Sequence, residues 1–136
     1  MNKSSAIKCG VTPENISALR TCEVFVFGSN LHGYHGGGAA AFAMRHFGAK
    51  WGVGVGMQGQ AYAIPTMHGG PEAIKPYVDQ FVEYAKEHPD KRFLVTKIGC
   101  GVAGFRPDEI APLFVGCLAL GNVSLPIEFI HCIIKW

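Results

Sequence analysis

Two short segments of this sequence combine glycine with side chains that could do chemistry. The first is the stretch 29–38, SNLHGYHGGG, which contains Asn30, His32 and His35. A histidine titrates near neutral pH and can act as a general base, while an asparagine can position a hydroxyl group. Simpler interpretations remain open: Asn30 can cap a turn, and the histidines can be loop residues that at most hydrogen-bond a phosphate. We rank His35 ahead of His32 because it adjoins the glycines.

The second segment is the stretch 99–104, GCGVAG, followed by Phe105. Glycines at such turns allow consecutive backbone N–H groups to point into one concavity, where a phosphate can bind. The alternative is that they only make tight turns. The segment formally matches the dinucleotide fingerprint GxGxxG, but that motif needs an acidic residue about 20 positions later. The stretch 114–124 has none, so NAD binding is not expected.

The cysteines do not indicate a metal site or a disulfide framework. There are five of them, an odd number, and no two have CxxC spacing. Cys100 lies in the second glycine segment, but no base that would activate it can be identified, so we interpret it as a small packing residue. We therefore expect reduced thiols, a cytoplasmic location, no metal and no organic cofactor.

The composition is that of one globular domain, which we take to span residues 1–136, with 1–22 as a peripheral N-terminal extension. Hydrophobic residues make up 49% and charged residues 16% of the 136 residues. The net charge is +2, and no basic run exceeds Lys91-Arg92, which disfavours nucleic acid as a partner. No apolar run is long enough to cross a bilayer, so no membrane association is expected. The oligomeric state stays open.

The two glycine segments must be positioned by the strands and helices that alternate along the chain. Short apolar runs rich in β-branched and aromatic residues predict strands, and runs with helical periodicity predict helices between them. Such an alternation favours an α/β domain with a largely parallel sheet, in which ligands bind at the carboxyl ends of the strands. The strands are predicted at 23–28, 61–65, 92–98 and 127–134, and the helices at 39–47, 73–88 and 108–120.

With both segments in view, the chain resembles the macrodomain superfamily, whose members bind ADP-ribose and in some cases hydrolyse its esters or protein-linked forms. The resemblance is carried by FVFGSN at 25–30 with GGGAA at 36–40, by GQAYAIPT at 59–66, and by VTKIGCGVAGF at 95–105. It implies a three-layer α/β/α sandwich with a mixed, largely parallel central sheet, and a ligand lying across both glycine segments.

The resemblance also implies roles for individual residues. Asn30 would contact the distal ribose, and Phe105 would lie against the ribose or the adenine. An aspartate follows the glycine run in many catalytic members, whereas this chain has alanine at 39–41, and Asn30 with His35 would have to replace it in catalysis. The resemblance puts an acidic residue that would contact the adenine near the start of the first strand; Glu14 and Glu23 are both candidates, and the choice stays open. The residues expected to hold the diphosphate are Gly36, Gly37, Gly38, Ala39, Gly99, Cys100, Gly101, Val102, Ala103 and Gly104.

Three functions follow as alternatives. The first is a module that binds ADP-ribose or a related nucleotide, free or protein-linked. The second is a hydrolase that removes ADP-ribosyl groups or processes ADP-ribose derivatives, with Asn30 and His35 at the reacting ribose. The third is a structural or assembly protein in which the glycines serve only close packing. The alanines at 39–41 favour the first function over the second.

Overall fold

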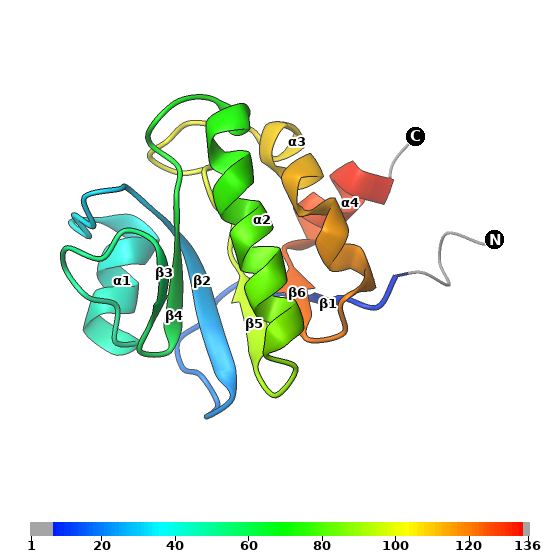
Figure 1. The fold of residues 1–136 in the computed structure, drawn as a ribbon, viewed down its shortest axis with the longest axis horizontal. Coiled ribbons are helices and arrows are strands. Elements are labelled where there is room, and N and C mark those ends of the chain that lie inside the picture. The colour runs from blue at the N-terminus through cyan, green and yellow to red at the C-terminus, as the bar shows by residue number, and fades with distance from the viewer. Residues whose placement is uncertain (1–6, 135–136) are drawn as a thin grey trace.

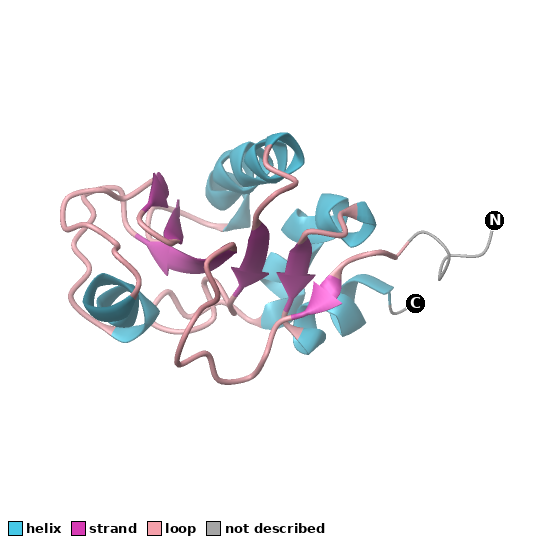
Figure 2. Cartoon of the chain, turned by 90° about the horizontal axis from the view of Figure 1, so that it is seen from below, coloured by secondary structure: helices cyan, strands magenta, loops and turns pink. Residues whose placement is uncertain are grey.

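The computed structural model describes residues 7–134 and contains one six-stranded sheet with helices on both of its faces (Figures 1 and 2). The strand order is β1-β6-β5-β2-β4-β3, and every neighbouring pair is parallel except the antiparallel pair β3–β4. The strands are β1 (Gly10–Val11), β2 (Glu23–Ser29), β3 (Gly56–Gln58), β4 (Ala61–Pro65), β5 (Arg92–Val95) and β6 (Val123–Leu125). The helical elements are α1 (Gly38–His46), α2 (Pro71–Glu87), α3 (Pro107–Ile110), the 3₁₀ helix η2 (Ala111–Ala119) and α4 (Ile127–Ile134).

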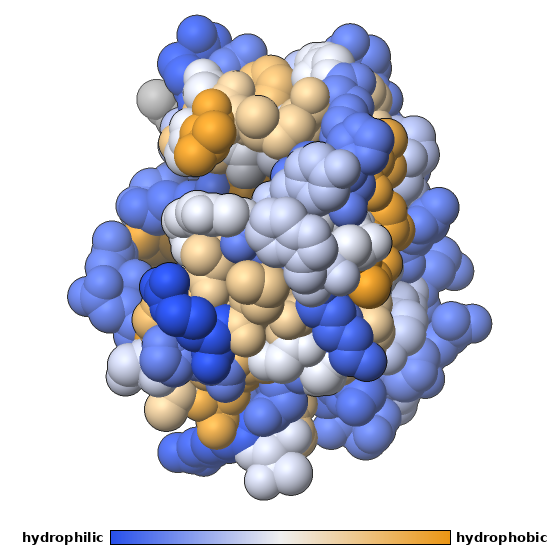
Figure 3. Space-filling view, turned by 90° about the vertical axis from the view of Figure 1, so that its left-hand side faces the viewer, coloured by the Kyte–Doolittle hydropathy of each residue, from blue (hydrophilic) through white to orange (hydrophobic). Residues whose placement is uncertain are grey.

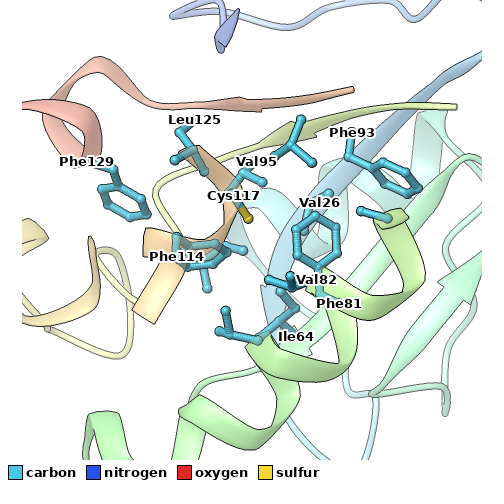
Figure 4. Close-up of a cluster of buried hydrophobic side chains, with 14 of the residues drawn as sticks. Val26, Ile64, Phe81, Val82, Phe93, Val95, Phe114, Cys117, Leu125 and Phe129 are labelled. Carbon is cyan, nitrogen blue, oxygen red and sulfur yellow. The ribbon is translucent and has the colours of Figure 1, made fainter. Parts of the chain in front are cut away.

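Alternation along β2 divides the core between the two faces of the sheet. Val24 and Val26 belong to the larger apolar cluster, which includes buried residues of α2, η2 and α4 such as Phe81, Phe114 and Phe129 (Figure 4). Phe25 and Phe27 belong to the smaller cluster on the opposite face, which α1 covers with alanines. β2 is therefore buried on both sides, as its uninterrupted apolar sequence predicts.

The predicted α/β class is confirmed, and so are the main elements. β2, α1, β4, α2 and β5 lie where strands and helices were predicted, with shifts of a few residues at their ends. The helix predicted over 108–120 is divided into α3 and the tighter η2, and Pro112 lies at the start of η2. A proline lacks the N–H that an uninterrupted α-helix requires there.

The predicted last strand over 127–134 is wrong: this segment is helix α4. The short apolar run fits either structure by periodicity alone. Its place in the sheet is taken by β6, which pairs with β5 on one side and with β1 on the other. Pro126, directly before α4, fits the start of a helix, where no N–H is needed.

The segment before β2 contributes to the sheet and to the core. β1 extends the sheet beyond β6, and the Thr12 hydroxyl donates a hydrogen bond of 2.7 Å to the Val95 carbonyl. Ile16 and Leu19 pack against the smaller apolar cluster. Within residues 7–134, no helix is long and apolar enough to cross a membrane.

Candidate functional site

Both glycine segments lie at the carboxyl edge of the parallel strands and line one cavity. The first segment connects β2 to α1 and the second follows β5, the neighbour of β2 in the sheet. The cavity has a volume of about 290 Å³. Its lining residues are Gly28, Ser29, Asn30, Tyr34, Gly37, Gly38, Ala39, Ala40, Thr66, Met67, Thr96, Lys97, Ile98, Gly99, Gly101, Val102 and Ala103.

The amino end of α1 faces this cavity with free backbone donors. α1 begins at Gly38, no side chain caps it, and its first turn has no acidic residue. A Cβ added at Gly36, Gly37 or Gly38 would meet no atom within 4 Å, so these glycines leave the backbone open rather than serve packing. Unpaired N–H groups and the helix dipole make such an end attractive to an anion.

Asn30 lines the cavity, and its side chain also organises the first segment. Its Nδ2 donates to the Tyr34 carbonyl and its Oδ1 accepts from the Tyr34 N–H, each at 3.0 Å. Asn30 thus has the turn-capping role, and its amide keeps one further donor and one further acceptor position for a ligand.

The second segment contains residues that line the cavity and residues that do not. Gly99, Gly101, Val102 and Ala103 line the cavity, whereas Cys100, Gly104 and Phe105 do not. Phe105 and Cys100 pack against the larger apolar cluster, and burial raises the pKa of the Cys100 thiol. Cys100 is therefore in the thiol form near neutral pH and is a packing residue, in line with the simpler interpretation.

His35 lies away from the cavity and is fully buried. Its Nε2 lies 3.0 Å from the Val53 carbonyl oxygen and 3.3 Å from Gln58 Oε1, which assigns the proton to Nε2 as a donor. Its ring packs edge-on against Phe27. The structure therefore does not bring His35 together with Asn30 at the mouth of the site; His35 joins the first segment to the β3 region instead.

Lys97 is a cavity residue that the sequence analysis did not single out. Its Nζ lies 2.9 Å from Glu128 Oε2 and 3.6 Å from Glu14 Oε1. The hydrogen bond with Glu128 is the main cause that raises the pKa of Lys97, and the same bond lowers the pKa of Glu128. The sequence signal that could have identified Lys97 is its position between β5 and the glycine segment, because residues at the carboxyl ends of parallel strands line ligand sites in α/β folds.

A second cavity, of about 240 Å³, adjoins the first across Thr96 and Lys97, which line both. It lies between the segment after β1 and the start of α4. Its other lining residues are Thr12, Pro13, Glu14, Ile16, Pro126, Ile127 and Glu128. Glu14 therefore lies near the site, while Glu23, at the opposite end of β2, accepts a hydrogen bond from the Arg20 N–H.

Comparisons of the chain with family models, with curated proteins and with solved structures gave no match. Residues 7–134 contain no group of three or more His, Cys, Asp or Glu side chains that could hold a metal ion. The function must therefore be argued from the two cavities and their lining.

Proposed function

We propose that this protein binds ADP-ribose or a related ADP-ribosyl nucleotide across the two adjoining cavities. The observation that carries the proposal is that two glycine segments from neighbouring parallel strands line one cavity, which also receives the uncapped amino end of α1. A diphosphate held there would accept hydrogen bonds from backbone N–H groups on both sides. The macrodomain-like, three-layer arrangement is part of the proposal, and α1 on one face of the sheet with α2 on the other supports it.

The charges around the larger cavity favour an anion. Within the described residues, its lining includes no Asp or Glu, and Lys97 is its cationic side chain. Lys97 stands at the boundary of the two cavities, where it can pair with a phosphate oxygen of a ligand that occupies both.

The smaller cavity suits the nucleobase. Its wall combines apolar side chains, such as Ile16 and Pro126, with the carboxylates of Glu14 and Glu128. A carboxylate accepts hydrogen bonds only, which matches the exocyclic amino group of adenine. We therefore propose Glu14, rather than Glu23, as the adenine contact, and place the distal ribose near Asn30 and Tyr34.

The lining supports binding rather than hydrolysis. The general base of a hydrolase is most often a carboxylate or an imidazole within hydrogen-bond reach of the reacting group. Neither lines the larger cavity among residues 7–134, and the Nε2 proton of buried His35 is used by the Val53 carbonyl. We accordingly propose a recognition module and assign Asn30 to ligand positioning.

The test is calorimetric titration with ADP-ribose, with ADP, AMP and NAD as comparisons. We expect a Kd of about 1 µM for ADP-ribose, or about −8 kcal/mol, and weaker binding of AMP. A matched pair of variants locates the site. Gly101 and Gly121 both have room for a side chain and no positive φ, but only Gly101 lines the cavity.

Gly101→Asp should weaken ADP-ribose binding by at least about tenfold, because a carboxylate repels a nearby diphosphate. Gly121→Asp should leave the affinity unchanged. No heat with any of the four nucleotides would refute the proposal and favour a structural role for the glycines. Equal losses in both variants would place the binding site elsewhere.

A further inference from the structure

An exposed row of aromatic rings stands beside the larger cavity, and of its three rings only Tyr34 also lines that cavity. Tyr34 stacks on His32 with ring centroids 5.2 Å apart and on Trp51 with centroids 5.5 Å apart, at interplanar angles of 24° and 18°. Tyr34 is 59% exposed and Trp51 is 58% exposed. We call these three rings the aromatic row. Large exposed rings are costly to leave in water and mark interaction surfaces.

The row is built on two loops that are held together by their backbones. Tyr34 comes from the loop before α1 and Trp51 from the loop after it. The Gly52 N–H donates to the Gly33 carbonyl at 2.9 Å, and a Cβ at Gly33 would collide with the backbone at Gly52 and Val53. The Leu31 N–H donates to His68 Nε2 at 2.7 Å, which fixes the beginning of the first loop. The rings are thus presented by a preformed scaffold.

The surroundings of the row favour an anionic partner. Between Glu23 and Glu72 the chain contains no Asp or Glu, and its two charged side chains there, Arg45 and Lys50, are both cationic. Lys50 directly precedes Trp51 in the loop after α1. Arg45 lies in the last turn of α1, just before that loop. The stretch between Glu23 and Glu72 contains α1, β3 and β4, which form one end of the molecule in Figure 1. In Figure 3, which looks onto that end, apolar and weakly polar residues form a central area bordered by hydrophilic ones.

Exposed, stacked rings next to a lysine, in a stretch of chain without Asp or Glu, are a combination that binds single-stranded nucleic acid. Bases stack on aromatic side chains, and the basic residues attract the phosphate backbone. A polypeptide would need acidic and aromatic residues side by side to match both features, whereas every nucleotide carries a phosphate and a base. We propose that the aromatic row and Lys50 form a binding surface for single-stranded nucleic acid. The net charge of +2 gave no reason to expect such a partner, because a composition does not show that the two unbalanced positive charges, Arg45 and Lys50, fall in one stretch of the chain.

The proposal can be tested separately from the ADP-ribose site through Trp51 and Lys50, which do not line the larger cavity. The probe is a fluorescein-labelled oligothymidylate of about twelve nucleotides, and the measurement is its anisotropy at low salt. Trp51→Ala should weaken binding by about tenfold, and Trp51→Phe should retain most of the affinity. Because Trp51 does not line the cavity, Trp51→Ala should leave the calorimetric affinity for ADP-ribose unchanged.

Charge variants provide the second arm of the test. Lys50→Ala should weaken binding and lower the salt dependence of the affinity, since each phosphate contact contributes to that slope. Lys75→Ala is the control, because Lys75 lies on α2 and pairs with Asp79. No binding of the oligonucleotide, or binding that Trp51→Ala leaves unchanged, would overturn the proposal. Displacement of the oligonucleotide by poly-glutamate of equal charge would assign the surface to an acidic polypeptide instead.

Discussion

The Nζ of Lys97 lies 2.9 Å from Oε2 of Glu128 at the boundary between the two cavities. This ion pair holds the one ammonium group of the larger cavity's described lining next to a carboxylate when no ligand is bound. A phosphate oxygen of the proposed ligand would have to compete with that carboxylate for Lys97. On the proposed function, the pair would lower the affinity for the ligand while it keeps the lysine side chain in position.

Neutralising Glu128 should strengthen nucleotide binding. In Glu128→Gln the ammonium of Lys97 is free of its closest carboxylate, so we expect the affinity for ADP-ribose to rise by about threefold. Lys97→Ala should lower it by about tenfold. Calorimetry at low and at high salt checks both changes in affinity. Both should be smaller at high salt, because salt screens the charges. A weaker affinity in Glu128→Gln would mean that the carboxylate itself contacts the ligand.

The same pair should make a small, pH-dependent contribution to stability. The folded state lowers the pKa of Glu128 below its usual 4.5, so the contribution is present above that pH and is lost as the pH falls through the lowered pKa. Because both side chains are partly exposed, it amounts to about 0.5 kcal/mol. Urea unfolding of the wild type and of Glu128→Gln should differ by this amount at neutral pH and converge in acid. A difference that persists in acid would show a packing effect.

His35 should matter for stability and not for nucleotide binding. His35→Ala removes the hydrogen bond to the Val53 carbonyl and leaves a buried void, which should cost about 3 kcal/mol of the free energy of unfolding. His32→Ala, an exposed change in the same loop, should cost under about 0.5 kcal/mol. Urea unfolding measures both, and calorimetry on folded protein should give unchanged ADP-ribose affinities. Loss of nucleotide binding without loss of stability would restore His35 to the site.

The position of His35 shows what the sequence could not reveal. Its neighbours Gln58 and Val53 lie 23 and 18 positions later in the chain, so its burial depends on how β3 and the preceding loop fold back. A histidine next to glycines has the same local signature whether it faces solvent or the core. The meeting of the two glycine segments was predictable, because both follow parallel strands and such strands end at one edge.

The short strands could not be predicted from the sequence either. β1, β3 and β6 have two or three residues each, too few to show a period-two pattern. The second cavity depends on β1 and on α4, whose segment was predicted to be a strand, so its lining could not be assembled from sequence. Lys97 could have been found from its position at the end of β5, but its ion pairs could not, because Glu14 and Glu128 become its neighbours only in the folded chain.

Thiol reactivity should separate the cysteines by burial. Burial raises the pKa of Cys117 to about 12 and also raises the pKa of Cys100, so both thiols should react slowly at neutral pH. Cys22 is exposed and should react first with a disulfide reagent such as Ellman's. Cys22→Ser should remove the fastest phase, and Cys100→Ser should leave ADP-ribose affinity unchanged within about twofold. A fast phase that disappears in Cys100→Ser would instead indicate a reactive thiol.

The glycines of the first segment should divide into two classes when they are replaced by alanine. Gly33 has a φ of +70°, and a Cβ there would collide with the backbone of the Trp51 loop, so Gly33→Ala should destabilise the protein by about 2–3 kcal/mol. Gly36 has open space around it and no positive φ, so Gly36→Ala should cost under about 0.5 kcal/mol.

Thermal or urea unfolding distinguishes the two classes. Because Gly33 brings the Tyr34 and Trp51 loops together, its alanine variant should also reduce oligonucleotide binding at temperatures where the protein is still folded. Gly36→Ala is the matched control for both readouts. Equal stability of the two variants would mean that the loops can separate without cost, and the aromatic row would then not be preformed.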